Sequence, residues 1–467
     1  MALRQYSKYG VQSQAQNDTM WEFFSQKTIF VTGGTGFLGS ALVLRLVSQA
    51  RSKCIYLLCR GGKHRAVQKW QKILPKPMSE TLISSDLITY LDGDIQEPNL
   101  ALPPTSLTLL KTTTEIIIHA ASSINLVDPL HKLSQSIIGA TERLAHFALS
   151  CPHLHRFVYI SSAFANSHLY AEASSRAAVD ISVRETLYPL HPSSPSSSSP
   201  SISTATIYEE LQSRGTTTEY ESRSHDFPWP YAYAKHLSER VLLQAFNQNH
   251  DQSPNHNHTH DAFPNKLLII RPSIFGPAQN FPYRGYSVPL STPLTTIATM
   301  VSLTPSIRFQ AATRAKNPDT EVTADEVPVD VVVDRTLFHL AYGSHGIVHA
   351  VCGERGRYAF KELWDDGMAV RKMPWRLRMT WLDVDWHSPR LHYIARLFVL
   401  YGMSFNFSEE RTVELWDRVP EEQRQGLNIF KDCSRGFGLL DRKEDMRVCA
   451  RALMSYFGYP KWIGSLL

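Results

Sequence analysis

Cysteine is scarce in this chain and is never arranged as a metal-binding pair. The 467 residues include six cysteines, none of them in a CxxC motif or at another spacing typical of zinc ligands. Scattered cysteines in a large chain are typical of reduced thiols in the cytoplasm. We therefore expect a cytoplasmic protein with no bound metal.

Long apolar runs are also missing. The N-terminal stretch MALRQYSKYGVQSQAQ lacks the apolar core of a signal peptide. Crossing a bilayer takes about 20 consecutive apolar residues, and the best candidate, Tyr393 to Phe405, is short and contains Arg396. We expect a soluble protein without a transmembrane segment, and peripheral contact with a membrane is left open.

Charge of one sign does not dominate either. The formal net charge is +5, with 43% hydrophobic and 19% charged residues, a composition typical of globular proteins. The weak positive charge without a basic run argues against nucleic-acid binding and permits anionic ligands such as phosphates or coenzyme A. A chain of this length can form a main domain and a smaller one.

A strand, a glycine-rich loop and a helix follow one another near the N-terminus. Residues 28–32, TIFVT, are β-branched and apolar, as in a buried strand, and GGTGFLGS and then ALVLRLVSQA follow. Gly33, Gly36 and Gly39 form a GxxGxxG pattern, which lets the backbone approach a pyrophosphate at the N-terminus of the helix. This order predicts a dinucleotide-binding α/β fold, a doubly wound parallel sheet.

The end of the second predicted strand indicates which dinucleotide is bound. The strand CIYLLCR ends at Arg60, 21 residues after Gly39. At about this distance NAD enzymes carry an acidic residue for the ribose 2′-hydroxyl, whereas NADP enzymes place an arginine there. Here Arg60 is followed by Lys63, His64 and Arg65, with no carboxylate between them. The pattern favours NADPH.

The strand–helix alternation continues downstream. The third predicted strand, LITYLDGDI, ends at Asp94 and Ile95, which we expect beside the adenine. The segment EIIIHAASSINL predicts a buried strand before His119, and the small residues after it, among them Ala121, allow the backbone to pass close to the cofactor. We interpret His119 itself as structural.

A fifth apolar strand, RFVYISSAFAN at residues 156–166, contains a pair of serines. A hydroxyl group at such a strand end can hold a substrate carbonyl oxygen beside an acid. Serine also ends strands without any catalytic role, so the residues alone leave both interpretations open.

Two tyrosines and a lysine lie close together in PWPYAYAKHLSER, residues 228–240. Residues four apart share a helical face, so Tyr231 and Lys235 point the same way and Tyr233 does not. A lysine ammonium beside a phenol favours the phenolate and lowers the tyrosine pKa, which makes the phenol a usable acid and base. Taken alone, the pair can also be a chance arrangement on a surface helix.

Together these motifs resemble a known family. The ordered set VTGGTGFLG, HAASSINL, YISSAFAN, YAYAK and IIRPSIFGP is similar to the extended short-chain dehydrogenases. Within them the chain resembles the fatty acyl-CoA reductase (male-sterility) branch and the related thioester-reductase domains, because DEVPVDVVVDRTL at 325–337 and ERTVELWDRVPEEQRQGLNIF at 410–430 are similar to segments of those reductases.

The resemblance implies roles for individual residues. Tyr231 is the implied general acid, Lys235 its partner and the holder of the nicotinamide ribose, and Ser162, rather than Ser161, the catalytic hydroxyl. The residues implied to line the pyrophosphate are Thr35, Gly36, Phe37 and Leu38, and those implied to flank the nicotinamide are Pro272 and Ser273. The chain departs from the pattern in having serine where threonine is common, and in ending in KWIGSLL without the apolar segment of membrane-anchored members.

Two polar segments read as insertions. Residues 191–206 are rich in serine and proline, and residues 247–265 contain four histidines, at positions 250, 256, 258 and 260. Low-complexity polar composition without a cysteine or a fixed carboxylate predicts solvated insertions, not a metal site. We expect an N-terminal extension at 1–26, an NADPH-binding reductase domain at 27–350 and a smaller, mainly helical C-terminal domain at 351–467.

The implied activity is reduction of an acyl thioester, carried by coenzyme A or a carrier protein, to the alcohol by way of the aldehyde. One alternative is a two-electron reductase that stops at the aldehyde. Another is an extended short-chain dehydrogenase that acts on a free ketone or alcohol, and a third is a cofactor-binding protein without turnover. The complete set of Ser162, Tyr231 and Lys235 argues against the last.

Overall fold

The computed structural model describes most of the chain. The described residues are 20–173, 180–190, 203–248, 263–392, 395–396, 398–435, 438 and 441–458. The predictions for residues 191–202 and for the four histidines of the polar insertion therefore lie outside the described residues.

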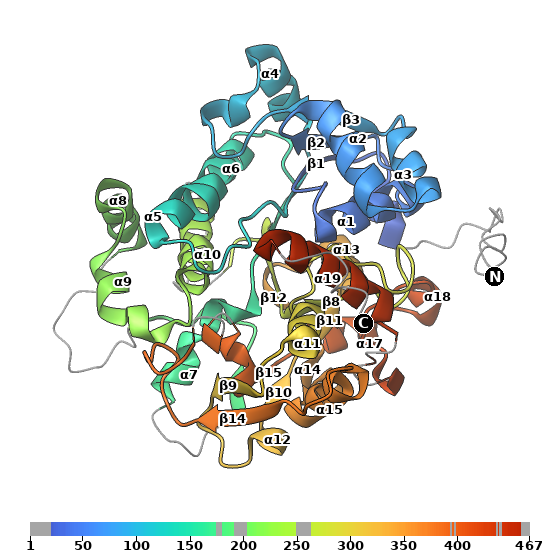
Figure 1. Ribbon diagram of the computed structural model, residues 1–467. Helices are drawn as coiled ribbons and strands as arrows, with labels where there is room; N and C mark the ends of the chain where they lie inside the picture. The colour runs from blue at the N-terminus through green and yellow to red at the C-terminus, as the bar shows by residue number, and fades with distance from the viewer. Residues whose placement is uncertain are drawn as a thin grey trace.

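The centre of the molecule is a seven-stranded sheet in which every pair of neighbouring strands is parallel (Figure 1). Its strands, in spatial order, are β12 (Gly346–Ala350), β7 (Leu267–Pro272), β5 (Arg156–Ile160), β4 (Ile116–His119), β1 (Thr28–Thr32), β2 (Cys54–Cys59) and β3 (Ile88–Asp92). The chain order reverses on either side of β1 and β4, as in doubly wound dinucleotide-binding sheets. The predicted fold class is confirmed.

Helices cover both faces of this sheet, so successive strand residues are buried in two different clusters. Ile29 and Val31 of β1 belong to one cluster and Phe30 to the other. The helices on the first face are α1 (Phe37–Gln49), α2 (Gly62–Ile73), α3 (Lys76–Ile83) and α13 (Val329–Ala341). Those on the second face are α4 (Pro104–Thr113), α6 (Ala140–Leu149) and α10 (Pro230–Gln248). Burial on both faces explains why the strands read as continuous apolar runs.

A second helical layer lies outside α10. The apolar residues of α5 (Leu130–Leu133) and α8 (Thr204–Arg214) share a cluster with the first turns of α10. The remaining short helices of this region are α7 (His168–Glu172) and α9 (Thr218–Arg223). This layer fixes the orientation of α10, the helix that carries the tyrosine pair.

Residues 20–24 do not behave as part of an N-terminal extension. They form a short 3₁₀ helix, MWEFF, in which Met20 and Phe24 are buried in the cluster that contains β1 and α13. The reductase domain therefore begins earlier in the chain than the predicted boundary at residue 27. Two or three apolar side chains in so short a segment do not form a periodic pattern, which is why the sequence did not reveal them.

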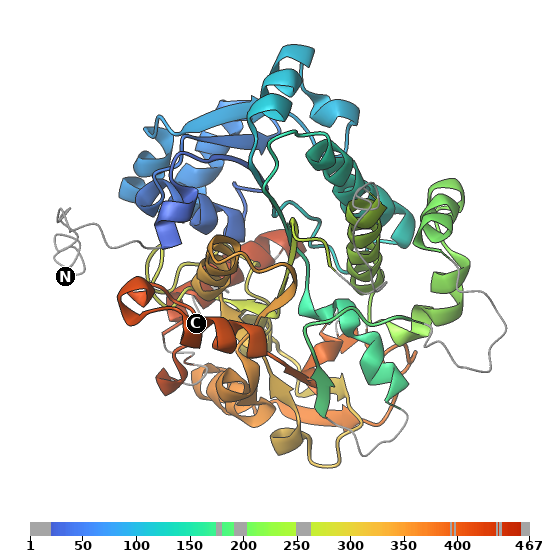
Figure 2. The ribbon, with the colours of Figure 1, turned by 180° about the vertical axis from the view of Figure 1, so that it is seen from behind.

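The part of the molecule outside the sheet and its covering helices is built from strand pairs and further helices, and in Figure 2 it is mostly yellow to red, with a green contribution from residues near 180. The strand pairs are β8 (Ile274–Gly276) with β11 (Glu326–Pro328), β9 (Arg308–Ala312) with β14 (Arg378–Leu382), β6 (Asp180–Val183) with β15 (Ser404–Phe407), and β10 (Thr323–Ala324) with β13 (Tyr358–Ala359). The helices are α11 (Pro293–Leu303), α12 (Pro318–Glu321), α14 (Gly353–Gly356), α15 (Phe360–Val370), α17 (Glu410–Arg418), α18 (Glu421–Arg424) and α19 (Lys443–Phe457).

These pairings cross the predicted boundary at residue 350. β14 and β15 follow it in the sequence, yet they pair with β9 and β6, which precede it. The smaller unit is therefore assembled from several stretches of chain and contains strands as well as helices. Strand pairing between distant segments leaves no trace in a local pattern, which is why the sequence suggested one continuous helical domain.

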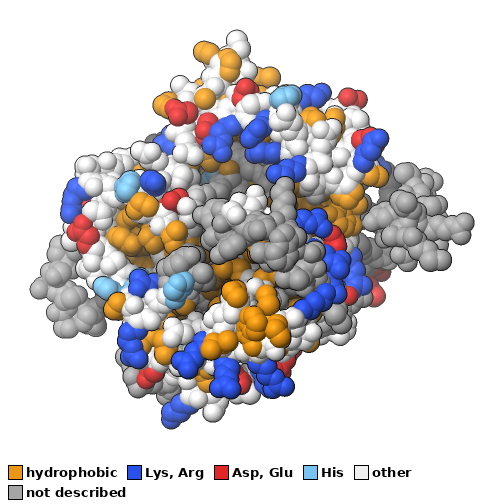
Figure 3. Space-filling view, in the orientation of Figure 1, with side chains coloured by type: hydrophobic (Ala, Val, Ile, Leu, Met, Phe, Trp, Pro, Cys, Tyr) orange, Lys and Arg blue, Asp and Glu red, His pale blue; other side chains and the backbone are white. Residues whose placement is uncertain are grey.

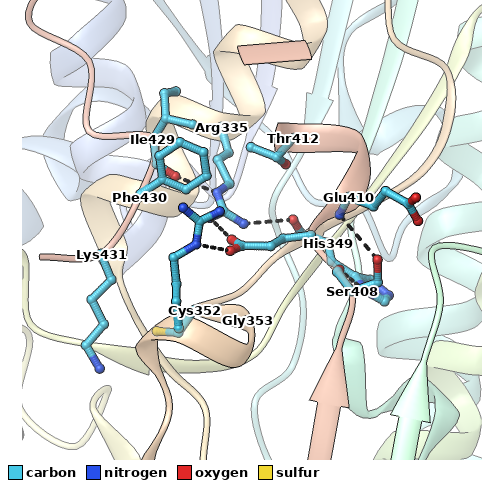
Figure 4. A network of polar contacts seen from close by, with 12 residues as sticks. Arg335, His349, Cys352, Gly353, Ser408, Glu410, Thr412, Ile429, Phe430 and Lys431 are labelled. Carbon is cyan, nitrogen blue, oxygen red and sulfur yellow. Dashed lines mark hydrogen bonds and ion pairs between the residues drawn. The ribbon is translucent and has the colours of Figure 1, made fainter. Parts of the chain in front are cut away.

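A buried ionic network joins the two parts (Figure 4). The Arg335 guanidinium on α13 donates to Glu409 at 2.5 Å and to the Ile429 carbonyl oxygen at 2.6 Å. Glu409 also accepts from Arg355 at 2.7 Å. Because Arg335 is fully buried, removal of Glu409 would leave a buried charge unpaired, which proteins tolerate poorly. The network holds the C-terminal segments against the sheet.

All six cysteines are free thiols. Among the helices of the described residues, none combines the length and the apolar character that spanning a bilayer requires.

Candidate active site

Every sequence-predicted site residue except those of α10 follows, or ends, a strand of the central sheet. Because all seven strands run parallel, their carboxyl ends meet at one edge. The loop glycines follow β1, Arg60 follows β2, and Asp94 and Ile95 follow β3. Ala121 follows β4, Ser162 follows β5, and Pro272 and Ser273 stand at the end of β7. In open α/β sheets this edge is where ligands bind.

Two positions of the loop after β1 require glycine. Gly33 has φ of +76°, and a Cβ placed there would lie 2.5 Å from the backbone nitrogen of Ala121. A Cβ on Gly39 would lie 2.1 Å from the carbonyl oxygen of Gly33. The loop after β1 thus runs in direct contact with the chain after β4, and α1 begins tightly packed under it.

The start of α1 is free of a side-chain cap. Gly36 is the N-cap and supplies no oxygen to the first turn, which leaves backbone N–H groups for an anion. Lys69 on α2 donates to the Thr35 hydroxyl at 3.2 Å, so a cation lies beside the same loop. Lys69 was not among the predicted site residues, because it lies outside the loop motif, and its i+4 spacing from Arg65 is the one local signal that places it on the same helical face.

Arg60 lies at the rim of this edge with its side chain 73% exposed. Its guanidinium is 3.7 Å from the Asp94 carboxylate, a loose contact. The nearby Asp92 carboxylate accepts from the backbone N–H of Gly61 at 2.7 Å, at the start of α2. The end of β2, where NAD enzymes carry an acidic residue, therefore holds the accessible Arg60. The carboxylate at the end of β3, that of Asp92, is already bound by the backbone N–H of Gly61.

The pair on α10 lies on one helical face, as predicted. The Lys235 ammonium is 5.9 Å from the centroid of the Tyr231 ring. It donates to the Ile160 carbonyl oxygen at 3.0 Å and to the Tyr159 hydroxyl at 3.2 Å. Lys235 is 1% exposed, and burial lowers its pKa to about 7.

The expected lowering of the Tyr231 pKa is wrong for this structure. Burial raises the pKa of Tyr231 above its ordinary value. The lysine does not offset this, because its ammonium is bonded to Ile160 and Tyr159 and is itself desolvated. A phenol with a raised pKa holds its proton firmly, so Tyr231 starts as an acid and not as a phenolate.

Tyr233 has a different environment from its neighbour. Its hydroxyl donates to the Glu219 carboxylate at 2.9 Å and lies 2.9 Å from the Thr217 hydroxyl. The same carboxylate accepts from Arg240 at 2.7 Å. Tyr233 is fully buried in the layer outside α10, so it fixes the helix in place.

The two serines after β5 also differ. The Ser161 hydroxyl donates to Glu239, which forms a fully buried ion pair with Arg271. The Ser162 hydroxyl accepts from the backbone N–H of Phe164 at 3.2 Å, which leaves its own hydrogen to be donated elsewhere. Tyr231 and Phe164 pack against the same apolar cluster, and the backbone N–H that Ser162 accepts belongs to Phe164.

Two further residues are engaged in the structure. The Ser273 hydroxyl donates to Asp325 at 2.5 Å, which holds the end of β7 against the segment before β11. His119 lies between two hydroxyl groups, 2.8 Å from Thr32 and 3.2 Å from Thr141, and burial lowers its pKa to about 3. A neutral, fully satisfied histidine is consistent with the structural interpretation.

The buried lysine predicts a pH dependence of stability. Lys235 in the unfolded chain titrates at its ordinary value, 10.5, and in the folded protein at about 7. Between these values the unfolded state holds the extra proton, so this group makes the free energy of unfolding rise with pH from about 7 to about 10.5. Lys235→Met should abolish that rise. Below pH 7 it should stabilise the ligand-free protein, because the variant no longer places a desolvated charge in the interior, and the two lost hydrogen bonds reduce that gain by about 1 kcal/mol each.

Chemical denaturation of both proteins across this pH range tests the prediction. Lys111→Met, at an exposed position on α4, is the control and should behave as the parent does. An equal pH slope in the parent and in the Lys235 variant would show that the lysine is not desolvated.

The loop, the uncapped helix and the Tyr–Lys pair fit a nicotinamide dinucleotide at the sheet edge. Glycine at positions 33 and 39 lets the loop fold tightly against its own backbone and the chain after β4, and the buried ammonium of Lys235 lies one helical turn from Tyr231. These features define an extended short-chain dehydrogenase, and the site is one for a nicotinamide cofactor.

The particular family follows from comparison. A family model described as "Male sterility protein" matches residues 31–336, well over half of the chain. The chain belongs to this family, as the sequence motifs indicated.

The curated proteins that this chain resembles include fatty acyl-CoA reductases. Fatty acyl-CoA reductase 2 of Mus musculus is 28% identical over 337 residues, which is 70% of this chain and 56% of the relative. Fatty acyl-CoA reductase 1 of Xenopus laevis is 24% identical over 333 residues, 68% of this chain and 55% of the relative. The chain thus spans about half the length of the curated relatives it matches.

Solved structures show the same fold. The terminal R domain of the myxalamid PKS-NRPS pathway aligns with a TM-score of 0.53 and 15% identity, covering 85% of this chain and 86% of that one. The reductase domain of the aureusimine biosynthetic cluster aligns with a TM-score of 0.51 and 14% identity, covering 87% and 88%.

Proposed function

We propose that the protein reduces an acyl thioester, a fatty acyl-CoA or a carrier-bound acyl chain, to the alcohol by way of the aldehyde, with NADPH as reductant. The observation that supports the proposal is the position of Lys235 between the Tyr231 ring and the end of β5, the strand that precedes Ser162, in a chain of the male-sterility family. Relatives in the mouse and the frog are named fatty acyl-CoA reductases, and that substrate class suits the acid chemistry of this site.

The residues divide the work of carbonyl reduction. Bound NADPH supplies a hydride to the carbonyl carbon. Ser162 and Tyr231 donate hydrogen bonds to the carbonyl oxygen, where negative charge develops, and Tyr231 transfers its proton to it. The hydroxyl and thioether groups then stand on one carbon. Breaking the carbon–sulfur bond releases the thiol, which takes up the hydroxyl proton, and leaves an aldehyde.

Lys235 supports both reductions by its position. Its ammonium would hold the ribose hydroxyls of the cofactor, and its positive charge would stabilise the Tyr231 phenolate until a proton from solvent restores the phenol. The aldehyde would present the same carbonyl oxygen to Ser162 and Tyr231, so the same residues would serve a second reduction, to the alcohol, with a second NADPH bound. Each step consumes one hydride and one proton.

NADPH should bind more tightly than NADH, because Arg60 offers an accessible guanidinium to the 2′-phosphate. Arg60→Ala should weaken NADPH binding by about 1.5 to 3 kcal/mol, the range for charged hydrogen bonds, and leave NADH binding nearly unchanged. Isothermal titration of both cofactors provides the measurement. Arg51→Ala is the control, since Arg51 is an exposed arginine beyond the other end of α1. Equal losses for the two cofactors would overturn the assignment.

Incubation of the purified protein with NADPH and a panel of acyl-CoA and carrier-bound thioesters tests the proposal. We expect thiol release together with an alcohol. Thiol release with an aldehyde as the final product would identify the two-electron reductase instead. Reduction of free ketones without thiol release would identify a dehydrogenase of small alcohols.

We also infer a cytoplasmic location. The support is the state of the cysteines, all six of which are free thiols in a large chain. Fractionation of cells that express the tagged chain provides the test, and recovery from an oxidising compartment would contradict it.

A further inference from the structure

Two loops outside the central sheet are joined side by side. One connects α11 to β9, and the other connects α15 to β14. Arg371 in the second loop donates to the Thr304 carbonyl oxygen at 2.8 Å, and the Trp375 indole N–H donates to that of Pro305 at 3.1 Å. These bonds hold the two loops together as one surface. We call this surface the loop platform and define it as residues 304–308 and 371–378.

The loop platform exposes large apolar side chains. Ile307 is 59% exposed and Trp375 is 41% exposed. Pro305 and Pro374, next to them, are exposed as well. Apolar side chains that are exposed singly need no explanation, whereas neighbouring ones mark an interaction surface. The loop platform therefore has the apolar component of such a surface.

Four exposed cations accompany these apolar side chains. Two of them flank Trp375 in the second loop, and the other two begin the strands that follow the loops. Within the part of the chain that the structure describes, none of the four forms an ion pair with a carboxylate. The four are Arg308, Lys372, Arg376 and Arg378.

Two of these cations are placed opposite each other. Arg308 and Arg378 are in register on the paired strands β9 and β14. Their neighbours Phe309, Leu377 and Met379 pack in the apolar cluster on one side of this pair. Side chains alternate between the two faces of a strand, so both arginines point to the outer face. Like charges at such positions repel, which is destabilising unless an anion lies over them.

The surrounding sequence offers no compensating acids. The chain contains no Asp or Glu from residue 262 to residue 318, and none from residue 367 to residue 382. Figure 3 shows several lysine and arginine side chains along the lower edge of the molecule, where Figure 1 places β14. The loop platform therefore carries a local excess of positive charge, which attracts an anionic partner.

We propose that the loop platform binds the surface of an anionic phospholipid membrane, with Ile307 and Trp375 entering the interface and the four cations contacting lipid phosphates. Tryptophan is enriched at membrane interfaces, and each Lys or Arg near an anionic bilayer raises affinity about fivefold. The cytoplasmic leaflet of cell membranes carries such lipids. The inference stands apart from the proposed function. Under that function, a long-chain alcohol would leave the enzyme beside the membrane into which it partitions.

The composition of the loop platform favours a membrane over a macromolecule. Ile307 is more exposed than Trp375 and is aliphatic, whereas the bases of a nucleic acid stack on aromatic side chains. A stable protein interface takes about 20 to 30 residues on each side, and the loop platform consists of two short loops. A bilayer sets no such minimum, because affinity grows with each apolar or basic side chain that reaches it.

Co-sedimentation of the purified chain with vesicles tests the proposal without turnover. Vesicles of phosphatidylcholine and phosphatidylserine in equal parts should bind the parent. Vesicles of phosphatidylcholine alone should bind it at least about tenfold more weakly, because they carry no net negative charge. Raising the salt from about 0.1 M to about 1 M shortens the Debye length from about 10 Å to about 3 Å, and it should remove most of this difference.

Lys372→Gln combined with Arg376→Gln removes two of the four cations from a loop between a helix and a strand. Binding to the mixed vesicles should fall about 30-fold, since each cation contributes about fivefold. Lys53→Gln combined with Lys132→Gln is the matched control, because it removes the same charge from exposed positions before β2 and on α5. The control should bind within about twofold of the parent, since charges remote from the bilayer are screened.

The apolar component has its own test. Ile307→Ser should weaken binding to the mixed vesicles at least about fivefold, because an aliphatic side chain no longer enters the interface. Vesicles with brominated acyl chains should quench the fluorescence of the parent more than that of Trp375→Phe. Thermal unfolding at the temperature of the parent shows that each variant is folded.

Three results would overturn the inference. They are equal binding of the parent to the two kinds of vesicle, equal losses in the Lys372–Arg376 variant and its control, and binding of single-stranded RNA or of an acidic protein without binding of vesicles. A parent that binds the mixed vesicles as expected but reduces no thioester would contradict the proposed function alone, because no step of the vesicle assay uses a thioester.

Discussion

Replacing Tyr231 with phenylalanine should lower the turnover of an acyl thioester by about 10²- to 10⁴-fold, the usual effect of removing a general acid. The phenol shares a helical face with Lys235, lies in the same cluster as Phe164, and keeps its proton because burial raises its pKa. The phenyl ring still fills its place, so NADPH should bind with nearly the parent affinity. Steady-state kinetics with thiol and alcohol both followed, together with cofactor titration, provide the measurement.

Tyr233→Phe is the natural control for this variant. Its hydroxyl serves the buried Glu219 and Thr217, not the substrate. We expect turnover close to the parent value and a loss of about 1 to 3 kcal/mol in the free energy of unfolding, because Glu219 loses a buried donor. If Tyr231→Phe keeps full thioester reduction while Tyr233→Phe loses it, the assignment of the proton donor fails.

Ser162→Ala should lower turnover by about 10²- to 10³-fold, the effect typical of removing one donor to a developing oxyanion. The loss should fall on kcat more than on KM, because the hydrogen bond strengthens as charge develops on the oxygen. The fold should tolerate the change well, since within the described part of the chain the hydroxyl accepts a single hydrogen bond, from the N–H of Phe164.

Ser161→Ala tests whether the neighbouring hydroxyl has a separate role. Ser161 donates to Glu239 within the fully buried ion pair with Arg271. Its removal should cost about 1 to 3 kcal/mol of stability and leave the rate constant of reduction within a few-fold of the parent. A large loss of kcat in the Ser161 variant alone, with normal thermal unfolding, would reverse the two assignments.

Much of the nucleotide-binding half could be predicted from the sequence, because its signals are local. The apolar run TIFVT and the three glycines stand within a dozen positions of one another, and they became β1 and the start of α1. A strand buried on both faces is apolar along its whole length, and a loop that touches another backbone needs glycine at the contact. Both requirements can therefore be recognised from neighbouring residues in the sequence. The helical spacing of Tyr231 and Lys235 is local in the same way.

The environment of those residues could not be predicted, because it comes from distant segments. The sequence placed a lysine beside a phenol, but not the Ile160 carbonyl oxygen that binds that lysine, nor the burial that raises the tyrosine pKa. Nothing near Ser161 in the sequence indicated that Glu239 and Arg271 would engage it. Burial and charge depend on what packs against a side chain, and that is a tertiary property.

By itself, then, the sequence determined the parallel sheet, the cofactor edge and the identity of the residues that stand there, since each follows from a short pattern with one physical meaning. Only the tertiary structure decided that β14 and β15 pair with strands from before residue 350 and that α11 and α15 pack in one apolar cluster. The amphipathic pattern of a helix indicates that one of its faces is buried, but it does not indicate which segment of the chain covers that face. Partner choice depends on contacts between segments far apart in the chain, and those contacts form only when the whole chain folds.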